Sequence, residues 1–212
     1  MIKYIFFDVS GTLMSKPSVF TNIIETLAKH GITISLQELK WKHKLLSEVI
    51  LFPDRTDKYF YNKFNTELLR ILGVLPTTEL VDDIFESCTY LPWEIFEDTA
   101  ALSEISLPKG IISNFDTSLK KKLNGYFGDI FEHVFGSEEF GISKPAITFY
   151  EAVLKKVGLP AGEILYIGDS IKLDIEPASK LGMKCLLIDR DSAFLNSSMR
   201  IDSLHDIKHY LD

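Results

Sequence analysis

The spacing of apolar positions changes along the chain, and each spacing predicts a different kind of secondary structure. Residues 4–7 form an uninterrupted apolar run, which is typical of a buried strand. Between Met14 and Pro92 apolar residues recur near the helical period of 3.6. Ser35, followed three residues later by Glu38, predicts a capping box at a helix start. We expect helices over 18–30, from Ser35, over 56–72 and over 78–90, with a loop at 51–55.

From residue 93 onward short apolar strands alternate with helices. This alternation predicts right-handed βαβ crossovers and a parallel sheet that is covered on both faces. We therefore expect an α/β fold, a doubly wound parallel sheet built from residues 1–13 and 93–212, with an inserted α-helical domain at 14–92. The expected strands are 109–113, 133–135, 164–167 and 185–188, and the expected helices are 116–123, 148–157, one ending at 181, and 204–211.

Composition and charge narrow the range of functions. The 212 residues are 46% hydrophobic and 25% charged, as in ordinary globular proteins. The net charge is −7 without a basic tract, so we expect no nucleic-acid partner. Cys88 and Cys185 lie far apart, which favours reduced thiols. The apolar runs are too short to span a membrane, and no signal peptide precedes residue 4, so we expect a cytoplasmic protein; monomer and dimer both remain open.

Candidate functional residues lie at the ends of the expected strands. Asp8, Ser113 and Asp169 each occupy such a position, and ligands bind at the carboxyl ends of parallel strands. Each motif taken alone also has an ordinary structural explanation as a turn, a helix cap or a solvated loop charge. The four segments are Asp8-Val9-Ser10-Gly11-Thr12, Ser113-Asn114-Phe115-Asp116, Lys144-Pro145, and Gly168-Asp169 with Asp174 five residues later.

Together, in this order and spacing, the four segments resemble the haloacid dehalogenase (HAD) superfamily, and the helical insertion resembles its C1-type cap. The resemblance implies a Rossmann-like core and a hydrolase, with phosphatase activity as the leading expectation. It implies that Asp8 attacks phosphorus and forms an aspartyl-phosphate. The substrate would be a small phosphorylated metabolite. Phosphate would be held by Ser113, Asn114 and Lys144, and Gly11 and Thr12 would shape the nucleophile loop.

The resemblance also implies a Mg²⁺ site. Mg²⁺ prefers oxygen ligands and takes only a few carboxylates. The ligands would be Asp8, Asp169 and the backbone carbonyl of Ser10, with Asp174 supporting them from the next layer. A nucleophilic carboxylate that faces a phosphoryl group also needs a nearby cation, which is the role implied for Lys144.

Ser10 departs from the family pattern, because phosphatases of the superfamily carry a second aspartate there as general acid and base. Serine cannot replace it near neutral pH, and a positioned acid/base contributes about 10²–10⁴-fold to the rate. One interpretation is a weakened or specialised phosphatase that takes substrates with good leaving groups or uses a surrogate group. A second is a catalytically silent protein that binds a phosphorylated ligand.

A third interpretation is chemistry of the dehalogenase or phosphonatase type, which makes no proton demand on the leaving group. The dehalogenases lack the metal carboxylates that Asp169 and Asp174 supply here. Phosphonatases use a cap lysine as a Schiff base, for which Lys16, Lys58 and Lys63 are the candidates. Candidate substrate contacts in the cap are Lys16, Phe52, Asp54 and Arg55, and His30 and His43 are expected on helix surfaces.

Overall fold

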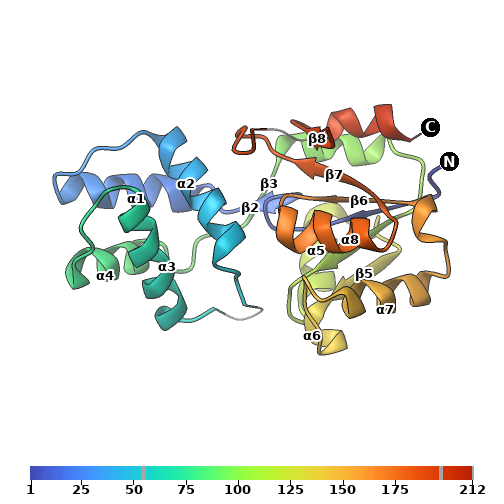
Figure 1. Cartoon of the computed structure of the whole chain (residues 1–212), viewed down its shortest axis with the longest axis horizontal. Coiled ribbons are helices and arrows are strands. Elements are labelled where there is room, and N and C mark those ends of the chain that lie inside the picture. The colour runs from blue at the N-terminus through green and yellow to red at the C-terminus, as the bar shows by residue number, and fades with distance from the viewer. Residues whose placement is uncertain (54–55, 196–197, 212) are drawn as a thin grey trace. The chain divides into compact units, whose positions relative to one another are not determined.

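The protein is described by a computed structural model that covers residues 1–53, 56–195 and 198–211 (Figure 1). The chain forms two compact units. The core unit comprises Met1–Ser15 and Ile95–Asp212, and the helical insert comprises Lys16–Glu94. Asp54 and Arg55, two of the expected substrate contacts, lie outside the described residues.

A parallel sheet organises the core unit and confirms the α/β prediction. Its six strands have the order β5-β4-β1-β6-β7-β8, with every adjacent pair parallel. The first strand of the chain, β1, therefore lies between β4 and β6, and Phe7 is in register with both Ile111 and Ile167. The strands are β1 (Tyr4–Phe7), β4 (Lys109–Ser113), β5 (His133–Gly136), β6 (Ile164–Gly168), β7 (Lys184–Ile188) and β8 (Arg200–Ile201).

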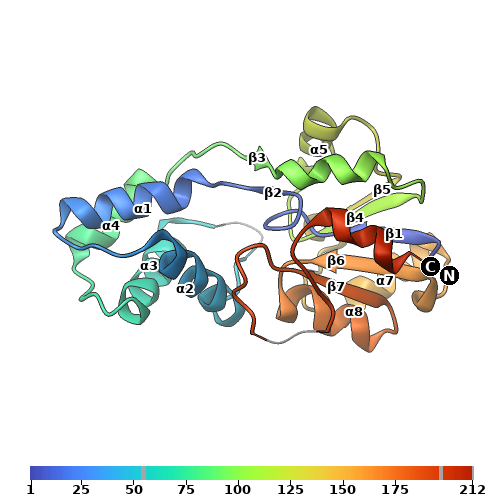
Figure 2. The same ribbon diagram turned by 90° about the horizontal axis from the view of Figure 1, so that it is seen from above.

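Both faces of the sheet are buried. On one face Phe6 and Tyr166 pack in a cluster with Phe149, from α7 (Ile147–Val157), and with Ala178, from α8 (Glu176–Lys180). Because side chains alternate along a strand, Ile5 and Phe7 face the other side, where they are fully buried as well. Figure 2 shows two 3₁₀ helices, η1 (Glu97–Ser103) and η4 (Leu204–Tyr210), running side by side against the core.

Several helix boundaries differ from those expected. The helix expected from Asp116 begins later, as α5 (Leu119–Phe127), because the Asp116 carboxylate accepts from Ser118 N and forms a turn first. The helix expected to end at 181 is divided into a π-helical turn, η3 (Ile171–Ile175), and α8, which has a proline in its first turn. The short elements α6 (Ser137–Phe140), η1, η2 (Ala161–Glu163) and β8 carry no periodic pattern and were not predicted.

The helical insert contains α1 (Ser18–Lys29), α2 (Leu36–Val49), α3 (Lys58–Ile71) and α4 (Thr78–Ser87). Ser35 caps α2 by accepting from Glu38 N at 3.1 Å, which confirms the predicted N-cap but not the reciprocal bond of a capping box. The helix expected from residue 56 begins at Lys58, because Asp57 caps α3 by accepting from Phe60 N at 2.8 Å. The apolar helix faces pack together through Ile23, Leu27, Leu39, Phe64, Leu68, Leu80 and Ile84.

Two further features concern the insert. Short strands β2 (Met14–Ser15) and β3 (Glu94–Ile95) pair where the chain leaves and re-enters the core unit. The prediction that His43 lies on a helix surface is wrong. Its ring packs between the rings of Phe20 and Phe64, with ring centroids 5.2 and 5.0 Å away. Over the described part of the chain, we find no helix with the length and apolar character needed to cross a bilayer.

Candidate active site

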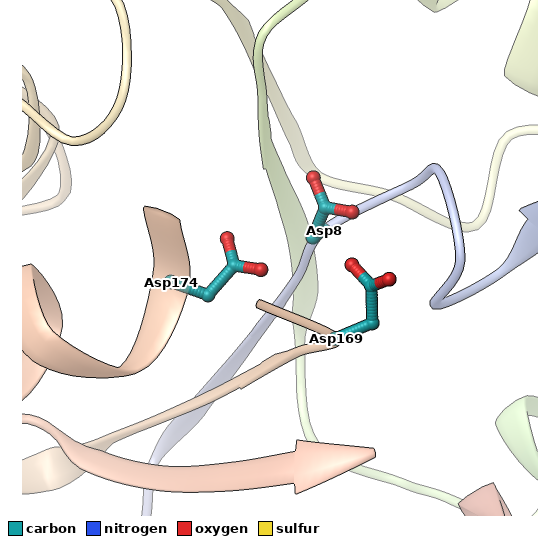
Figure 3. Close-up of side chains that lie close together, drawn as sticks. All are labelled: Asp8, Asp169 and Asp174. Atoms are coloured by element: carbon teal, nitrogen blue, oxygen red, sulfur yellow. The ribbon is translucent and has the colours of Figure 1, made fainter. Parts of the chain in front are cut away.

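Three carboxylates converge at one edge of the core sheet. Asp8 directly follows β1, Asp169 follows β6, and Asp174 lies in the π-helical turn after it. One carboxylate oxygen from each residue lies within 4.8 Å of the others. Figure 3 shows the three side chains pointing toward one another from these elements. The neighbouring positions of β1 and β6 in the sheet bring together residues that are far apart in the sequence.

Lys144 connects two of these carboxylates. Its ammonium nitrogen lies 2.6 Å from Asp8 Oδ1 and 2.6 Å from Asp174 Oδ1. The side chains of Lys144, Asp8 and Asp174 are only 2%, 7% and 1% exposed. Water therefore screens these ion pairs little, and each buried charge is stabilised mainly by its ion-pair partners.

Asn114 holds the backbone of Lys144. Its Oδ1 accepts from Lys144 N at 2.7 Å, and its Nδ2 donates to Lys144 O at 3.0 Å. The side-chain amide thus uses both ends to fix the loop that carries the ammonium. This geometry gives Asn114 a supporting role, and its expected contact with substrate stays a prediction.

Ser113, the last residue of β4, completes the surroundings of Asp8. Its hydroxyl donates to Asp8 Oδ1 at 3.1 Å, which is the oxygen that also binds Lys144. Two donors on Oδ1 fix the orientation of the carboxylate and direct Oδ2 away from this pair. A hydroxyl from the end of β4, an ammonium from a loop and the carboxylate that follows β1 are therefore brought together.

Tyr166 is a site residue that the sequence pattern did not single out. Its hydroxyl lies 2.8 Å from Asp174 Oδ1 and 3.3 Å from Lys144 Nζ, while Asp174 Oδ2 accepts from Ser170 N at 3.0 Å. Asp174 therefore uses both oxygens within the protein. A tyrosine in an otherwise apolar buried strand needs a partner for its hydroxyl, and this was the available signal.

Burial and charge act together on the ionisable groups. Burial raises the pKa of the Asp8 carboxyl to about 6; Lys144 opposes this shift, whereas Asp174 and Asp169 add to it. Burial alone would lower the pKa of Lys144, but the carboxylates of Asp174 and Asp8 outweigh it and raise this pKa above its usual value. Lys144 is accordingly a permanent cation in this site.

Two glycines make the close packing of the carboxylates possible. Gly11 has φ +86°, and a Cβ there would lie 2.1 Å from Asp169 Oδ2. A Cβ at Gly168 would lie 2.3 Å from Asp174 Cγ. Side chains at either position would displace a carboxylate, so both glycines are needed for the geometry itself.

The loop that follows Asp8 is compact. Thr12 is buried, and its N–H, like those of Leu13 and Met14, donates to the carbonyl of Val9. Ser10 lies on the exposed side of this loop, next to a Gly11 N–H that donates to Met14 O at 2.7 Å.

The candidate residues of the helical insert have local partners. Lys16 Nζ lies 5.1 Å from the ring centroid of Trp93, and Phe52 packs against Phe60 in the insert's apolar cluster. Lys58 forms an ion pair with Asp82 at 3.0 Å, and this hydrogen bond raises the pKa of Lys58. A raised pKa is the opposite of what a Schiff-base lysine needs.

The donor set of the site fits a divalent cation. Asp8 and Asp169 offer oxygen donors, which hard cations such as Mg²⁺ prefer, and Asp174 lies in the same cluster. The two buried carboxylates, Asp8 and Asp174, also carry one more negative charge than the ammonium of Lys144 neutralises. Burying this excess negative charge is costly unless a cation joins it, because buried like charges repel strongly.

Comparison with known proteins agrees with this geometry. Residues 2–182 match the family model described as haloacid dehalogenase-like hydrolase. The chain belongs to the haloacid dehalogenase-like hydrolases. Its HAD fold is also seen in the structure of the HAD-hydrolase YfnB from Bacillus subtilis bound to magnesium, which has a TM-score of 0.65 and 19% identity over 99% of this chain and 98% of that one.

Relatives within the family differ in activity. The chain is 28% identical to a glyceraldehyde 3-phosphate phosphatase of Methanocaldococcus jannaschii, over 86% of this chain and 83% of that protein. It is 27% identical to an (S)-2-haloacid dehalogenase of Pseudomonas fluorescens, over 88% and 84% of the two chains. Membership of the HAD family therefore leaves the reaction to be argued from the site.

Proposed function

We propose that this HAD hydrolase is a Mg²⁺-dependent phosphatase that acts on a small phosphorylated metabolite through an aspartyl-phosphate on Asp8. The observation that carries the proposal is the buried Lys144 ammonium, 2.6 Å from both Asp8 and Asp174, beside the third carboxylate of Asp169. The phosphatase relative from Methanocaldococcus jannaschii supports the same reaction class.

The residues around Asp8 have complementary roles in this reaction. Ser113 and Lys144 both bind Asp8 Oδ1, which leaves Oδ2 to attack phosphorus. The ammonium of Lys144 also offsets the repulsion between the carboxylate and an incoming phosphate. Attack forms the Asp8 Oδ2–phosphorus bond and breaks the bond from phosphorus to the leaving oxygen; water then cleaves the acyl phosphate and regenerates Asp8.

Mg²⁺ would be held by Asp8, Asp169 and the backbone carbonyl of Ser10. When bound, the ion supplies positive charge that stabilises the phosphoryl oxygens as negative charge builds on them. Asp174 uses both oxygens on Lys144, Tyr166 and Ser170, so we assign it to positioning the ammonium rather than to direct metal binding.

Ser10 sets the preference among substrates. A leaving alkoxide needs a proton, and the serine hydroxyl is a poor acid near neutral pH. The leaving group of an aryl or acyl phosphate needs little protonation, so such substrates suit this site better. The selection of substrate by the helical insert stays a prediction from the family resemblance.

The test compares an aryl phosphate with an alkyl phosphate, each with Mg²⁺ and with a chelator, and includes a 2-haloacid. We expect faster aryl phosphate hydrolysis, full dependence on Mg²⁺, and complete loss in Asp8→Asn. Equal rates on both esters would show that another group replaces the acid at position 10. Halide release without phosphate release would establish the dehalogenase alternative. Mg²⁺-dependent phosphate-ester binding without any turnover would establish the silent-binder alternative.

A further inference from the structure

Arg190 reaches the nucleophile loop from the far end of the chain. It follows β7, yet its Nη1 donates to Gly11 O at 3.0 Å and its Nη2 donates to Thr12 O at 2.9 Å. Two consecutive peptide carbonyls of the loop are thus bound by one guanidinium. A single side chain that binds both can fix the orientation of both peptide planes.

The opposite ends of these two peptide planes are also held. The N–H groups of Thr12 and Leu13, which share their peptide planes with the carbonyls of Gly11 and Thr12, donate to Val9 O at 3.3 and 2.9 Å. Arg190 therefore binds the outer side of the loop while Val9 O binds the inner side. The loop between the nucleophile and the chain's exit toward β2 is clamped from both sides.

The guanidinium is itself fixed by the segment that returns from the helical insert. Asp98 accepts from Nε at 3.0 Å and from Nη2 at 2.8 Å, and the Phe96 ring centroid lies 3.9 Å from the guanidinium carbon. Asp98 Oδ2 also accepts from Leu204 N at 2.9 Å, at the start of η4. The charge of Arg190 is thus paired within the protein and directed at the loop carbonyls.

We propose that Arg190, oriented by Asp98, is a positioning residue that holds the Ser10–Leu13 loop in the conformation required for reaction at Asp8. Asp8 itself is held by the sheet, since its N–H donates to Ile167 O, whereas the loop beyond it leaves the sheet. This assignment rests on the proposed function only for its effect on turnover, because its effect on the loop is measurable without any substrate.

Lysine is the informative replacement. It keeps the positive charge beside Asp98, but its ammonium lacks the planar fork that reaches two carbonyls and a carboxylate together. Arg200→Lys is the matched control, because Arg200 lies in the same C-terminal segment and binds Phe194 O and the Asp202 carboxylate there. Asp98→Asn tests the orienting carboxylate separately.

The first measurement is amide hydrogen exchange of the full-length protein without substrate. In Arg190→Lys we expect exchange at Thr12, Leu13 and Met14 to accelerate at least about tenfold, with β1 and β6 amides unchanged. Asp98→Asn should give a smaller effect at the same amides, and Arg200→Lys should give none. Unchanged loop exchange in Arg190→Lys would overturn the proposal, as would acceleration throughout the sheet, which would mark a general stabiliser.

The second measurement is turnover of the aryl phosphate. A misplaced catalytic group costs up to about 10²-fold, so we expect kcat of Arg190→Lys to fall about 10- to 100-fold while KM stays within about threefold. Arg200→Lys should keep both constants. A kcat equal to that of Arg200→Lys would overturn the positioning role. An inactive wild type would count against the proposed phosphatase function alone, since the exchange result stands without activity.

Discussion

Replacing Lys144 with methionine should make the stability of the core unit strongly dependent on pH. The substitution keeps most of the side-chain volume but removes the ammonium that lies 2.6 Å from both Asp8 and Asp174. Two carboxylates then remain buried without this partner. Breaking a buried ion pair from one side typically costs about 3–5 kcal/mol, and we expect a loss of that size at pH 8.

The loss should shrink as the pH falls, because protons can replace the missing cation. Burial already raises the pKa of Asp8 to about 6, although Lys144 opposes this shift. Without the ammonium of Lys144 the pKa of Asp8 should rise further. A carboxyl whose folded-state pKa lies above its unfolded value binds more protons when folded, so stability is gained as the pH falls through the folded pKa. The gain is about 1.4 kcal/mol per pH unit for one proton, so most of the cost should disappear by pH 5.

The assay is urea denaturation in metal-free buffer at pH 5 and pH 8, compared with wild type at each pH. Lys3→Met is the matched control, because Lys3 pairs with Glu163 at 2.9 Å on the surface, where its side chain is 57% exposed. Exposed pairs contribute about 0–1 kcal/mol, so the control should show a small loss. A Lys144→Met loss as small as that of Lys3→Met, or equal losses at pH 5 and 8, would refute the reasoning.

Two further predictions address the metal and the helical insert. Asp169→Asn removes an anionic oxygen from the carboxylate group and should weaken Mg²⁺ binding, measured by calorimetry, by at least about tenfold, with a smaller effect in Asp174→Asn; unchanged affinity in both would remove the proposed metal site. Burial lowers the pKa of His43 to about 4, and the charge of Lys44 adds to this shift. Between about pH 6.5 and pH 4, His43 is therefore protonated in the unfolded chain but not in the folded chain. Stability should therefore fall by at most about 3 kcal/mol as the pH drops through that window, and His43→Gln should flatten the urea-denaturation profile; the wild-type slope persisting in that variant would contradict this assignment.

The sequence was sufficient to place Asp8, Ser113 and Asp169 at one edge of the sheet. Their strands are short apolar runs, and parallel strands expose their carboxyl ends on the same side. The spacing could not show that Lys144 touches both Asp8 and Asp174, because a lysine before a proline is also an ordinary loop residue. That contact depends on how a loop folds back over 136 residues of chain.

Other site residues were beyond the reach of local patterns. Tyr166 occupies an apolar strand and resembles a core residue until its hydroxyl is seen beside Asp174. Arg190 contacts carbonyls 178 and 179 residues away, and backbone carbonyls leave no mark in a sequence. The π-helical turn before α8 could not be predicted either, because its apolar residues have the spacing of a normal helix.

The central claim, a phosphoenzyme on Asp8, is tested most directly by intact-mass measurement after mixing the Mg²⁺-loaded protein with an aryl or acyl phosphate donor. Because Ser10 cannot activate water well, the adduct should accumulate in the wild type. It should be absent in Asp8→Asn and short-lived in Ser10→Asp, which restores a carboxylate and should speed alkyl phosphate turnover by up to about 10²–10⁴-fold. Rapid wild-type turnover without any adduct, or an adduct that persists in Asp8→Asn, would contradict the account.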